Sequence, residues 1–304
     1  MIDFSALSLV LTTLMGFLGR RWWIFDWFSH FRVQSFFLSA LIGLIYIIGK
    51  NRWMTALMVV LALFNAGLIL PLYSMPPHHQ SGEPVYRILL ANVLKENPNH
   101  AVLSNLIAES DPDFVMLIEV NQAWLDDLNL SALGYEHFIA ETREDNFGIA
   151  LYSRYDLVNS EIQRFGQLDT PSIVAHLKID QQPVVFILSH PVPPKTKWMT
   201  LQRSIQMTDL MTYAGELDEI VLAAGDFNAT SWSPYYKDWL QLSQLRDSRK
   251  GFGIQPTWPT DNWLLRVPID HILVSPEINV QYRAVGPDIG SDHFPLIMDF
   301  SLSD

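Results

Sequence analysis

Three long apolar stretches, separated by short polar segments, occupy the first 75 residues. Residues 4–18 form a stretch of about fifteen positions, residues 33–49 hold seventeen uncharged positions, and residues 53–73 hold twenty-one. A helix needs roughly 20 apolar residues to cross the bilayer core, with a range of about 17–25. The second and third stretches therefore predict transmembrane helices, whereas the first is marginal.

The ends of these stretches carry residues that are typical of membrane interfaces. Lys50, Asn51 and Arg52 make a short polar turn between the second and third stretches, which is the pattern of a membrane hairpin. A secretory signal peptide fits poorly, because two more apolar stretches follow the first and no basic residue precedes it. We therefore expect residues 1–75 to be a membrane anchor of two to three helices, in a multi-pass protein of the bacterial inner membrane. Four tryptophans hold the interface positions, Trp22, Trp23, Trp27 and Trp53.

The basic residues around the stretches give conflicting signals about orientation. Cytoplasmic loops are enriched in Lys and Arg. Lys50 and Arg52 in the cytoplasm would place the rest of the chain outside, whereas Arg20, Arg21 and Arg32 there would keep it inside. The second group lies in an aromatic segment that can rest in the interface, where its charges count less. We therefore expect an exoplasmic or periplasmic catalytic domain. The alternative to a membrane anchor is that the apolar stretches are buried helices of a soluble core.

Beyond a linker rich in Pro, Gly and polar residues at 76–84, short apolar runs alternate with segments of helical period. This alternation predicts an α/β fold, a four-layered α/β sandwich of two β-sheets flanked by helices, in one domain over residues 85–304. Strands are predicted at 85–91, 114–120, 147–153, 172–179, 184–188, 220–224, 269–274 and 294–300, and helices at 101–109, 122–133 and 195–213.

The charge of this second region restricts its partners. Residues 81–304 hold 15 Lys and Arg against 30 Asp and Glu, a formal charge of −15. Proteins that bind a phosphate backbone normally carry a basic stripe, so a nucleic-acid partner is disfavoured unless a local cluster serves it. The chain has no cysteine, which excludes disulfides and thiolate metal sites. The candidate clusters are Lys195, Lys197 and Arg203, and Arg246, Arg249 and Lys250.

Polar residues recur where the predicted strands begin or end. A carboxylate buried at such a position is costly unless it is paired or bound to a metal. Carboxylate oxygens suit a hard cation such as Mg²⁺, while His and Asn suit proton donation and phosphoryl-oxygen binding. The pattern predicts metal-assisted phosphoester hydrolysis, although a turn former, a helix cap or a solvated strand start is the alternative at single positions. The residues are Asn92, Glu119, His190, Asp226, Asn228, Asp270, Asp292 and His293.

These residues resemble, in order along the chain, the motifs of the endonuclease/exonuclease/phosphatase superfamily. The resemblance covers about residues 85–302, and its most specific parts are Gly225-Asp226-Phe227-Asn228 and Ser291-Asp292-His293. It implies Mg²⁺ as cofactor, with Mn²⁺ as an alternative. It also implies that Glu119 is the principal metal ligand, with Asn92 beside it and Asp292 near a second or shared metal position.

The same resemblance implies catalytic roles. Asp226 would orient or deprotonate the attacking water, and Asn228 would hold a non-bridging phosphoryl oxygen. His293 would lie across the scissile phosphate, kept protonated by Asp270, and His190 would offer a second imidazole for the developing charge or the leaving oxygen. Relatives often place substrate-contacting side chains in the segment that holds Arg143 and Asn146, and an ordinary charged turn is the alternative there.

The expected partners are the lipid bilayer and a phosphorylated small molecule or lipid as substrate. A membrane-tethered endonuclease or exonuclease is the main alternative function. A membrane scaffold without activity is a further one, although the motifs that it would be expected to lose are intact. His271 adjoins Asp270 and points to the opposite face of a strand, so we interpret it as structural.

Overall fold

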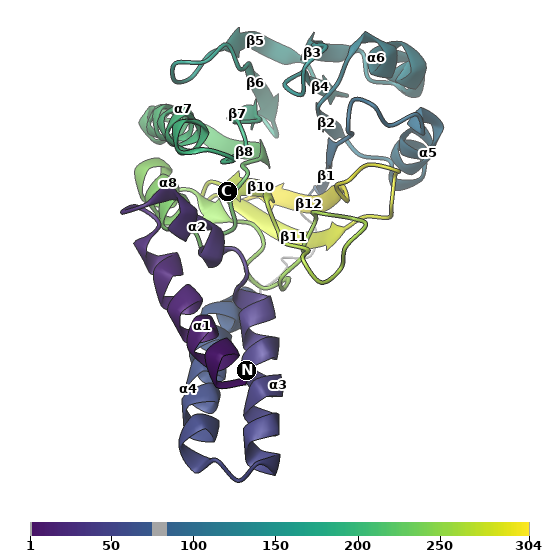
Figure 1. The fold of residues 1–304 in the computed structure, drawn as a ribbon. Coiled ribbons are helices and arrows are strands. Elements are labelled where there is room, and N and C mark those ends of the chain that lie inside the picture. The colour runs from purple at the N-terminus through teal and green to yellow at the C-terminus, as the bar shows by residue number, and fades with distance from the viewer. Residues whose placement is uncertain (1, 75–83, 304) are drawn as a thin grey trace.

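The computed structural model describes residues 2–74 and 84–303 (Figure 1). The predicted linker at 76–84 lies outside the described residues except for its last position. Two six-stranded mixed sheets pack face to face and are covered by helices on their outer faces, which confirms the predicted α/β sandwich. The covering helices are α5 (His100–Ser110) and α6 (Gln122–Leu128) on one side, and α7 (Lys197–Glu216) and α8 (Pro234–Ser243) on the other.

The two sheets have similar plans. Each contains one parallel pair, β1–β2 in the first sheet and β7–β8 in the second, joined by a helical crossover through α5 or α7. The first sheet has the order β11 (Ile278–Val285), β12 (Leu296–Leu302), β1 (Tyr86–Asn92), β2 (Phe114–Ile118), β4 (Ile149–Ser153) and β3 (His137–Glu141). The second has the order β5 (Leu157–Gln163), β6 (Ser172–Ile179), β7 (Gln182–Ser189), β8 (Ile220–Asp226), β10 (Asp270–Val274) and β9 (Arg246–Asp247).

The central strands are apolar along their whole length because both of their faces are covered. In β2 every residue is buried. Phe114, Met116 and Ile118 face the core between the sheets, whereas Val115 and Leu117 pack under α5 and α6. This double burial explains why the sequence shows continuous apolar runs at these strands rather than strict alternation.

Within the described part of the sandwich, four strands and the helix α8 were not predicted, and all four strands are sheet edges: β3, β5, β9 and β11. An edge strand is half-exposed and carries polar residues, so it lacks the apolar run on which the prediction depended. In β5, for example, Val158, Asn159 and Glu161 are exposed. The predicted helix at 122–133 is also divided, because Asn129 takes a left-handed conformation with φ of 41° and a 3₁₀ turn follows it.

The N-terminal region forms helices that project from one end of the sandwich (Figure 1). Arg52–Tyr73 is the one helix, among the described residues, that is long and apolar enough to cross a membrane by itself. The first two helices meet that criterion only as a pair bent by 115°, and the third is apolar but shorter. The helices are α1 (Ile2–Met15), α2 (Trp23–Ser29), α3 (Arg32–Ile48) and α4 (Arg52–Ile69), with 3₁₀ turns at Gly16–Leu18 and Leu70–Tyr73.

Candidate active site

The predicted residues meet at one edge of the sandwich because the parallel strands end there. Asn92 ends β1, and Glu119 directly follows β2. His190 follows β7, and Asp226 ends β8. Asp270 opens the antiparallel strand β10 directly opposite Asp226 in the register. The sheet topology therefore brings together side chains that are up to 178 residues apart in sequence, from Asn92 to Asp270.

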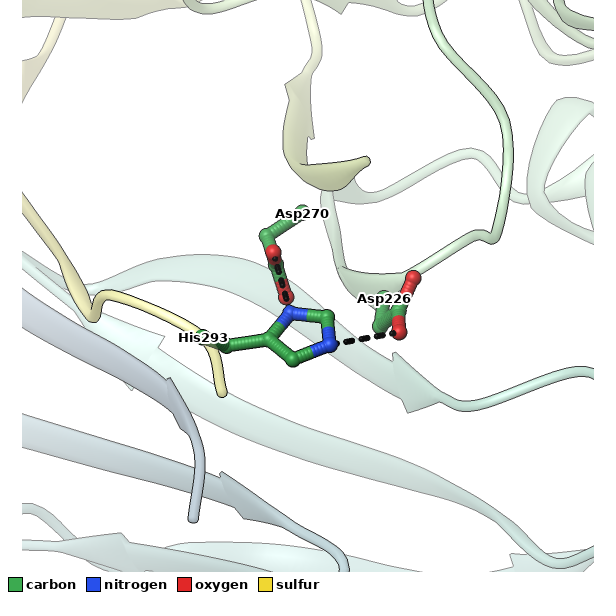
Figure 2. A group of neighbouring side chains, drawn as sticks. All are labelled: Asp226, Asp270 and His293. Atoms are coloured by element: carbon green, nitrogen blue, oxygen red, sulfur yellow. Dashed lines mark hydrogen bonds and ion pairs between the residues drawn. The ribbon is translucent and has the colours of Figure 1, made fainter. Parts of the chain in front are cut away.

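His293 lies at the centre of the group, between two carboxylates (Figure 2). Its Nδ1 is 2.8 Å from Asp270 Oδ2, and its Nε2 is 3.6 Å from Asp226 Oδ2. Burial opposes a charged imidazolium, but Asp270 and then Asp226 outweigh it and raise the pKa of His293 to about 10. His293 therefore carries a positive charge at neutral pH.

The second imidazole, of His190, has the opposite electrostatic environment. Its Nε2 is 3.6 Å from Asp226 Oδ2, the same oxygen that His293 Nε2 approaches. Burial, followed by repulsion from charged His293, lowers the pKa of His190 to about 4, so its imidazole is neutral. Asp226, which lies between the two rings, has a pKa well above its usual value, because it is buried and close to Asp270. The three groups are poised for proton transfer.

Glu119 is buried on the side of the site that belongs to the first sheet. Asn92 Nδ2 donates to its Oε1 and Asn146 Nδ2 donates to its Oε2, each at 3.0 Å. Its backbone has φ of 64°, a region that is unfavourable for a glutamate and that the surrounding structure must hold in place. Burial raises the pKa of Glu119 above its usual value. In the described part of the chain no Lys or Arg forms an ion pair with this carboxylate.

A divalent cation fits this donor set. Mg²⁺ prefers carboxylate and amide oxygens and leaves space for water and phosphate oxygens. Glu119 offers a buried carboxylate without a basic partner, and Asn92 offers an amide beside it. A second set of potential ligand atoms lies within 4.8 Å in Asp226, Asp270 and His293. An imidazolium has no free lone pair, so protonated His293 fits a proton donor better than a metal ligand.

Strands β7 and β8 approach each other closely at the end of β8, and a tight turn follows. A side chain at Gly225 would place its Cβ 1.8 Å from the carbonyl oxygen of Ser189 on β7, so only glycine fits there. The backbone N–H of Asn228 donates to Asp226 Oδ1 at 2.8 Å, and its side-chain Nδ2 donates to the carbonyl of Pro191 at 3.0 Å. These bonds hold the carboxylate of Asp226 and the amide of Asn228 at the edge of the site.

The other predicted residues divide between the site and its surroundings. Asp292 lines the same cavity, and its Oδ2 accepts from the Trp258 indole at 3.1 Å. Asn146 lines it too, whereas Arg143 is not one of the lining residues, and its guanidinium binds the carboxylates of Glu141, Asp145 and Asp169. His271 faces away from the site, where its Nε2 lies 2.7 Å from the carbonyl of Ala229.

The cavity over these residues also includes part of the N-terminal region, which was not predicted. It has a volume of about 670 Å³, and Trp27, His30 and Phe31 line it together with Glu119, His190, Asp226 and His293. The one sequence signal for this contact is Asp26, a single acid within an aromatic and apolar segment.

Asp26 explains how that segment is held. It is fully buried, and its carboxylate accepts from Arg203 Nη2 at 2.8 Å and from the Ser233 hydroxyl at 2.7 Å. Arg203, also fully buried, donates through Nη1 to the backbone carbonyl of Asn228 at 2.5 Å. The His30 Nδ1 lies 3.1 Å from the Thr230 hydroxyl. Helix α2 is therefore bonded to the same turn that carries Asp226 and Asn228.

Comparison with known proteins agrees with this geometry. The family model described as Endonuclease/Exonuclease/phosphatase family matches residues 64–293. No curated protein sequence matches the chain. Similar solved structures include D. rerio TDP2 complexed with a single-strand DNA product, with 20% identity and a TM-score of 0.62, covering 72% of this chain and 100% of that one.

Two further structures show how varied the proteins with this fold are. The human Nocturnin catalytic domain, bound to a sulfate anion, has 22% identity and a TM-score of 0.61, and the match covers 73% of this chain and 96% of that one. A Bacteroides thetaiotaomicron mannosyl-6-phosphatase has 20% identity and a TM-score of 0.60, with 71% and 100% covered. At these identities the similarity establishes the fold and leaves the substrate open.

Proposed function

Since this chain belongs to the endonuclease/exonuclease/phosphatase family, we propose that it is a membrane-anchored, Mg²⁺-dependent phosphoesterase. Members of the family are hydrolases that act on phosphoester bonds and generally depend on a divalent metal. The proposed reaction is in-line attack of water on a phosphodiester or phosphomonoester of a small molecule or lipid. The supporting observation is the charged imidazolium of His293 beside Asp226, in a site that also holds the Glu119 carboxylate.

Glu119 and Asn92 would hold the metal ion, and Asp292, which lines the same cavity, would share it or hold a second one. When bound, the ion neutralises charge on the phosphoryl oxygens and lowers the pKa of a bound water. The two amides that bond Glu119 fix the orientation of its carboxylate before any ligand arrives. Such pre-organisation lowers the reorganisation needed during the reaction.

Asp226 accepts the proton of the attacking water. Its raised pKa makes it a stronger base than an exposed aspartate, and the Asn228 N–H keeps one of its oxygens in place. The Asn228 amide has a second N–H, besides the one bonded to Pro191, that can donate to a non-bridging phosphoryl oxygen. Asp226 thus acts on the attacking water, and Asn228 acts on the phosphoryl group that the water attacks.

His293 supplies the positive charge. Its imidazolium stabilises the charge that develops on the phosphoryl group and is the proton source for the leaving oxygen. The directions of the two pKa shifts favour His293 over His190 in this role, because His190 is neutral near pH 7. Neutral His190 remains a hydrogen-bond donor to the phosphoryl group.

The test of this function is hydrolysis by the full chain in detergent micelles. We expect turnover of a chromogenic phosphodiester or phosphomonoester with Mg²⁺, none with EDTA, and a loss of about 10²–10⁴-fold in kcat for Asp226→Asn. Asp156→Asn, at an 88% exposed side chain, is the control and should retain activity. Equal activity of Asp226→Asn and the native chain would disprove the assignment.

A nuclease is the second candidate, and the positions of the basic residues argue against it. Arg203 is buried in the pair with Asp26, and Arg249 is buried beside Asp247. Arg246 donates to three backbone carbonyls, two in the loop before β11 and one at the first residue of that strand. Among the described residues that line the cavity, Lys195 is the only Lys or Arg. Single- and double-stranded DNA nevertheless belong in the substrate panel, because TDP2 has this fold and binds DNA.

The exposed surfaces of the N-terminal helices support the membrane anchor. Large apolar side chains cover their outer faces, and Phe4, Phe37 and Leu63 are 77%, 64% and 66% exposed. Only 33% of the apolar 18-residue window of Arg52–Tyr73 is buried inside the protein, whereas a core helix of a soluble protein is mostly buried. Apolar faces of this size need a partner, and a lipid bilayer is the partner that helices of this length fit.

The contacts of the basic residues favour an exoplasmic or periplasmic catalytic domain. Arg20 is paired with Asp238 of the sandwich, and Arg32 is fully buried and bonded to the carbonyl of Thr13. Lys50 and Arg52 are exposed at the far end of the α3–α4 hairpin. Arg21 is exposed as well, but it is a single charge next to the paired Arg20, whereas the two exposed charges at the hairpin tip are those that the positive-inside rule would hold in the cytoplasm.

Single cysteines test this orientation, because the native chain has none. A membrane-impermeant maleimide applied to intact spheroplasts should label Asn159→Cys on β5 and leave Asn51→Cys at the hairpin tip unlabelled. Lysed spheroplasts are the control, in which both positions should react. The reverse labelling would place the catalytic domain in the cytoplasm.

A further inference from the structure

The cavity at the active site has two unlike parts. Glu119, Asp226 and His293 form its reactive part. The rest of the lining is largely apolar and includes Trp27, Phe31, Phe147, Met199, Val267 and Ile269. A volume of about 670 Å³ exceeds what one phosphoryl group needs. The apolar part, which we call the apolar wall, is therefore available to another portion of the substrate.

The apolar wall is held on both sides of the catalytic centre. The Trp27 indole donates to the carbonyl of Pro194 at 3.0 Å, next to the loop after β7. Gln34 Nε2 donates to the carbonyls of Leu264 and Arg266, each at 3.1 Å, in the loop before β10. Together with the buried Asp26–Arg203 pair, these bonds fix the N-terminal segment against the site.

The charges around the cavity restrict the ligand to one with few negative groups. Glu119, Asp145, Asp226 and Asp292 line it, and Lys195 is the single Lys or Arg in the lining. A bound divalent ion and His293 can compensate one phosphoester. These cationic groups suit one phosphoester rather than a polyanion, and an apolar body is the better complement to the apolar residues of the lining.

The position of the apolar wall indicates where such a ligand would come from. Phe31 is followed directly by Arg32, the first residue of α3. Helix α3 carries some of the most exposed apolar side chains of the chain, among them Phe37, Leu41 and Ile48. The apolar surface inside the cavity therefore begins at the residue next to a helix that we assign to the bilayer.

We propose that the apolar wall binds the hydrocarbon chain of a membrane lipid whose phosphoester is cut at the catalytic centre. This inference rests on the proposed phosphoesterase function and specifies its substrate class. Water would add to phosphorus as the ester bond breaks, Asp226 would take the proton of the water, and His293 would protonate the leaving oxygen. The N-terminal region would then be part of the substrate site as well as an anchor.

A chain-length series tests the inference without altering the protein. The substrates are p-nitrophenyl alkyl phosphates from ethyl to octyl, used below their micellar concentrations with the full chain in micelles and Mg²⁺. Burial of one methylene contributes about fourfold in affinity. We expect kcat/KM to rise by up to about fourfold per methylene through a falling KM, and release of nitrophenolate to require Asp226.

Variants of the apolar wall locate the effect. Phe31→Ala and Trp27→Ala should reduce the dependence of kcat/KM on chain length, measured as the ratio of octyl to ethyl substrate. Trp53→Ala is the matched control, because this 75% exposed tryptophan at the hairpin tip does not line the cavity, and the ratio should stay at its native value. An unchanged ratio in both wall variants would overturn the assignment of the chain site.

The outcomes separate this inference from the proposed function. Mg²⁺- and Asp226-dependent turnover with a flat chain-length series would retain the phosphoesterase and reject the lipid chain. Failure of every substrate to turn over would reject both. Phospholipids in nanodiscs complete the experiment, and hydrolysis of DNA or a soluble sugar phosphate in preference to every lipid would also overturn the inference.

Discussion

The sandwich and the N-terminal helices place their apolar side chains in opposite ways. In the sandwich, Phe114 and Leu151 lie between the sheets and are fully buried. In α3 and α4, Phe37 and Val60 are both 64% exposed. The two regions therefore differ in the surroundings that their surfaces suit. The exposed apolar side chains of α3 and α4 are the basis of the proposed membrane anchor.

Helix α2 belongs to neither pattern, and it shows that the two regions are one functional unit. Asp26 and Arg203 form an ion pair in which both side chains are fully buried. Charges of this kind are costly to bury unless each has a partner, so the pair requires both regions to be present. Arg203 also bonds the carbonyl of Asn228. The border between anchor and catalytic domain that the sequence predicts therefore runs through the active site.

The largest effect is expected within the sandwich, at the carboxylate that holds His293. Asp270→Asn should lower kcat by about 10²–10⁴-fold. The pKa of His293 is raised to about 10 mainly because Asp270 overcomes burial, so the imidazolium persists until the pH rises through that value. Without the Asp270 charge the pKa falls, and activity should be lost at a lower pH as the pH rises. The pH profile of kcat measures this shift.

A surface pair provides the control for that variant. Asp127 Oδ2 lies 2.6 Å from His100 Nδ1, at the first residue of α5, and neither residue lines the cavity. Asp127→Asn removes an aspartate from a histidine in the same way and should leave both kcat and the pH profile unchanged. Similar profiles for Asp270→Asn and the native chain would contradict the role of Asp270.

The second effect is expected at the junction of the two regions. Asp26→Asn leaves Arg203 buried without its counter-ion, and loss of one partner of a buried pair costs about 3–5 kcal/mol of unfolding free energy. Because Arg203 positions Asn228, kcat should fall as well. Thermal unfolding in micelles and kcat together measure the two consequences. If the Asp26–Arg203 pair only tethered the two regions, Asp26→Asn would leave kcat unchanged.

An exposed ion pair across the same junction is the matched comparison. Arg20 binds Asp238 of α8, and their side chains are 55% and 39% exposed. Exposed pairs contribute about 0–1 kcal/mol, so Asp238→Asn should have a small effect on stability. The double variant Asp26→Asn with Arg203→Met should recover stability relative to Asp26→Asn, because no unpaired charge stays buried.

The contrast between centre and edge explains how much of the fold could be predicted. The central strands β1, β2, β7 and β8 are buried on both faces, so their sequences are apolar runs that end in a polar residue. The same runs locate Asn92, Glu119, His190 and Asp226, because parallel strands end at one edge. Edge strands such as β5 lack this signal, since one face and one side of the backbone meet solvent.

The apolar wall could not be predicted, because it depends on contacts between distant segments. Trp27 and Phe31 lie in an aromatic segment whose composition suits a membrane interface equally well. Their place in the cavity follows from the pairing of Asp26 with Arg203, which are 177 residues apart. A single sequence contains no periodic signal for such a pair. The helix α8, by contrast, has a readable start in its capping Ser233 and first-turn Pro234.

The smallest effect is expected when an aspartate is placed on the exposed surface of each region. This pair of variants tests the difference between the two surfaces directly. Leu41 of α3 and Val158 of β5 are 56% and 64% exposed, so neither change creates a cavity. An aspartate near the middle of a transmembrane helix costs about 2.5–3.5 kcal/mol of insertion free energy. Leu41→Asp should therefore lower the fraction of protein that stays in carbonate-washed membranes, whereas Val158→Asp should not. If both variants stay in the membrane to the same extent, or Leu41→Asp yields active protein in the soluble fraction, α3 does not contact lipid, and the lipid route to the apolar wall loses its support.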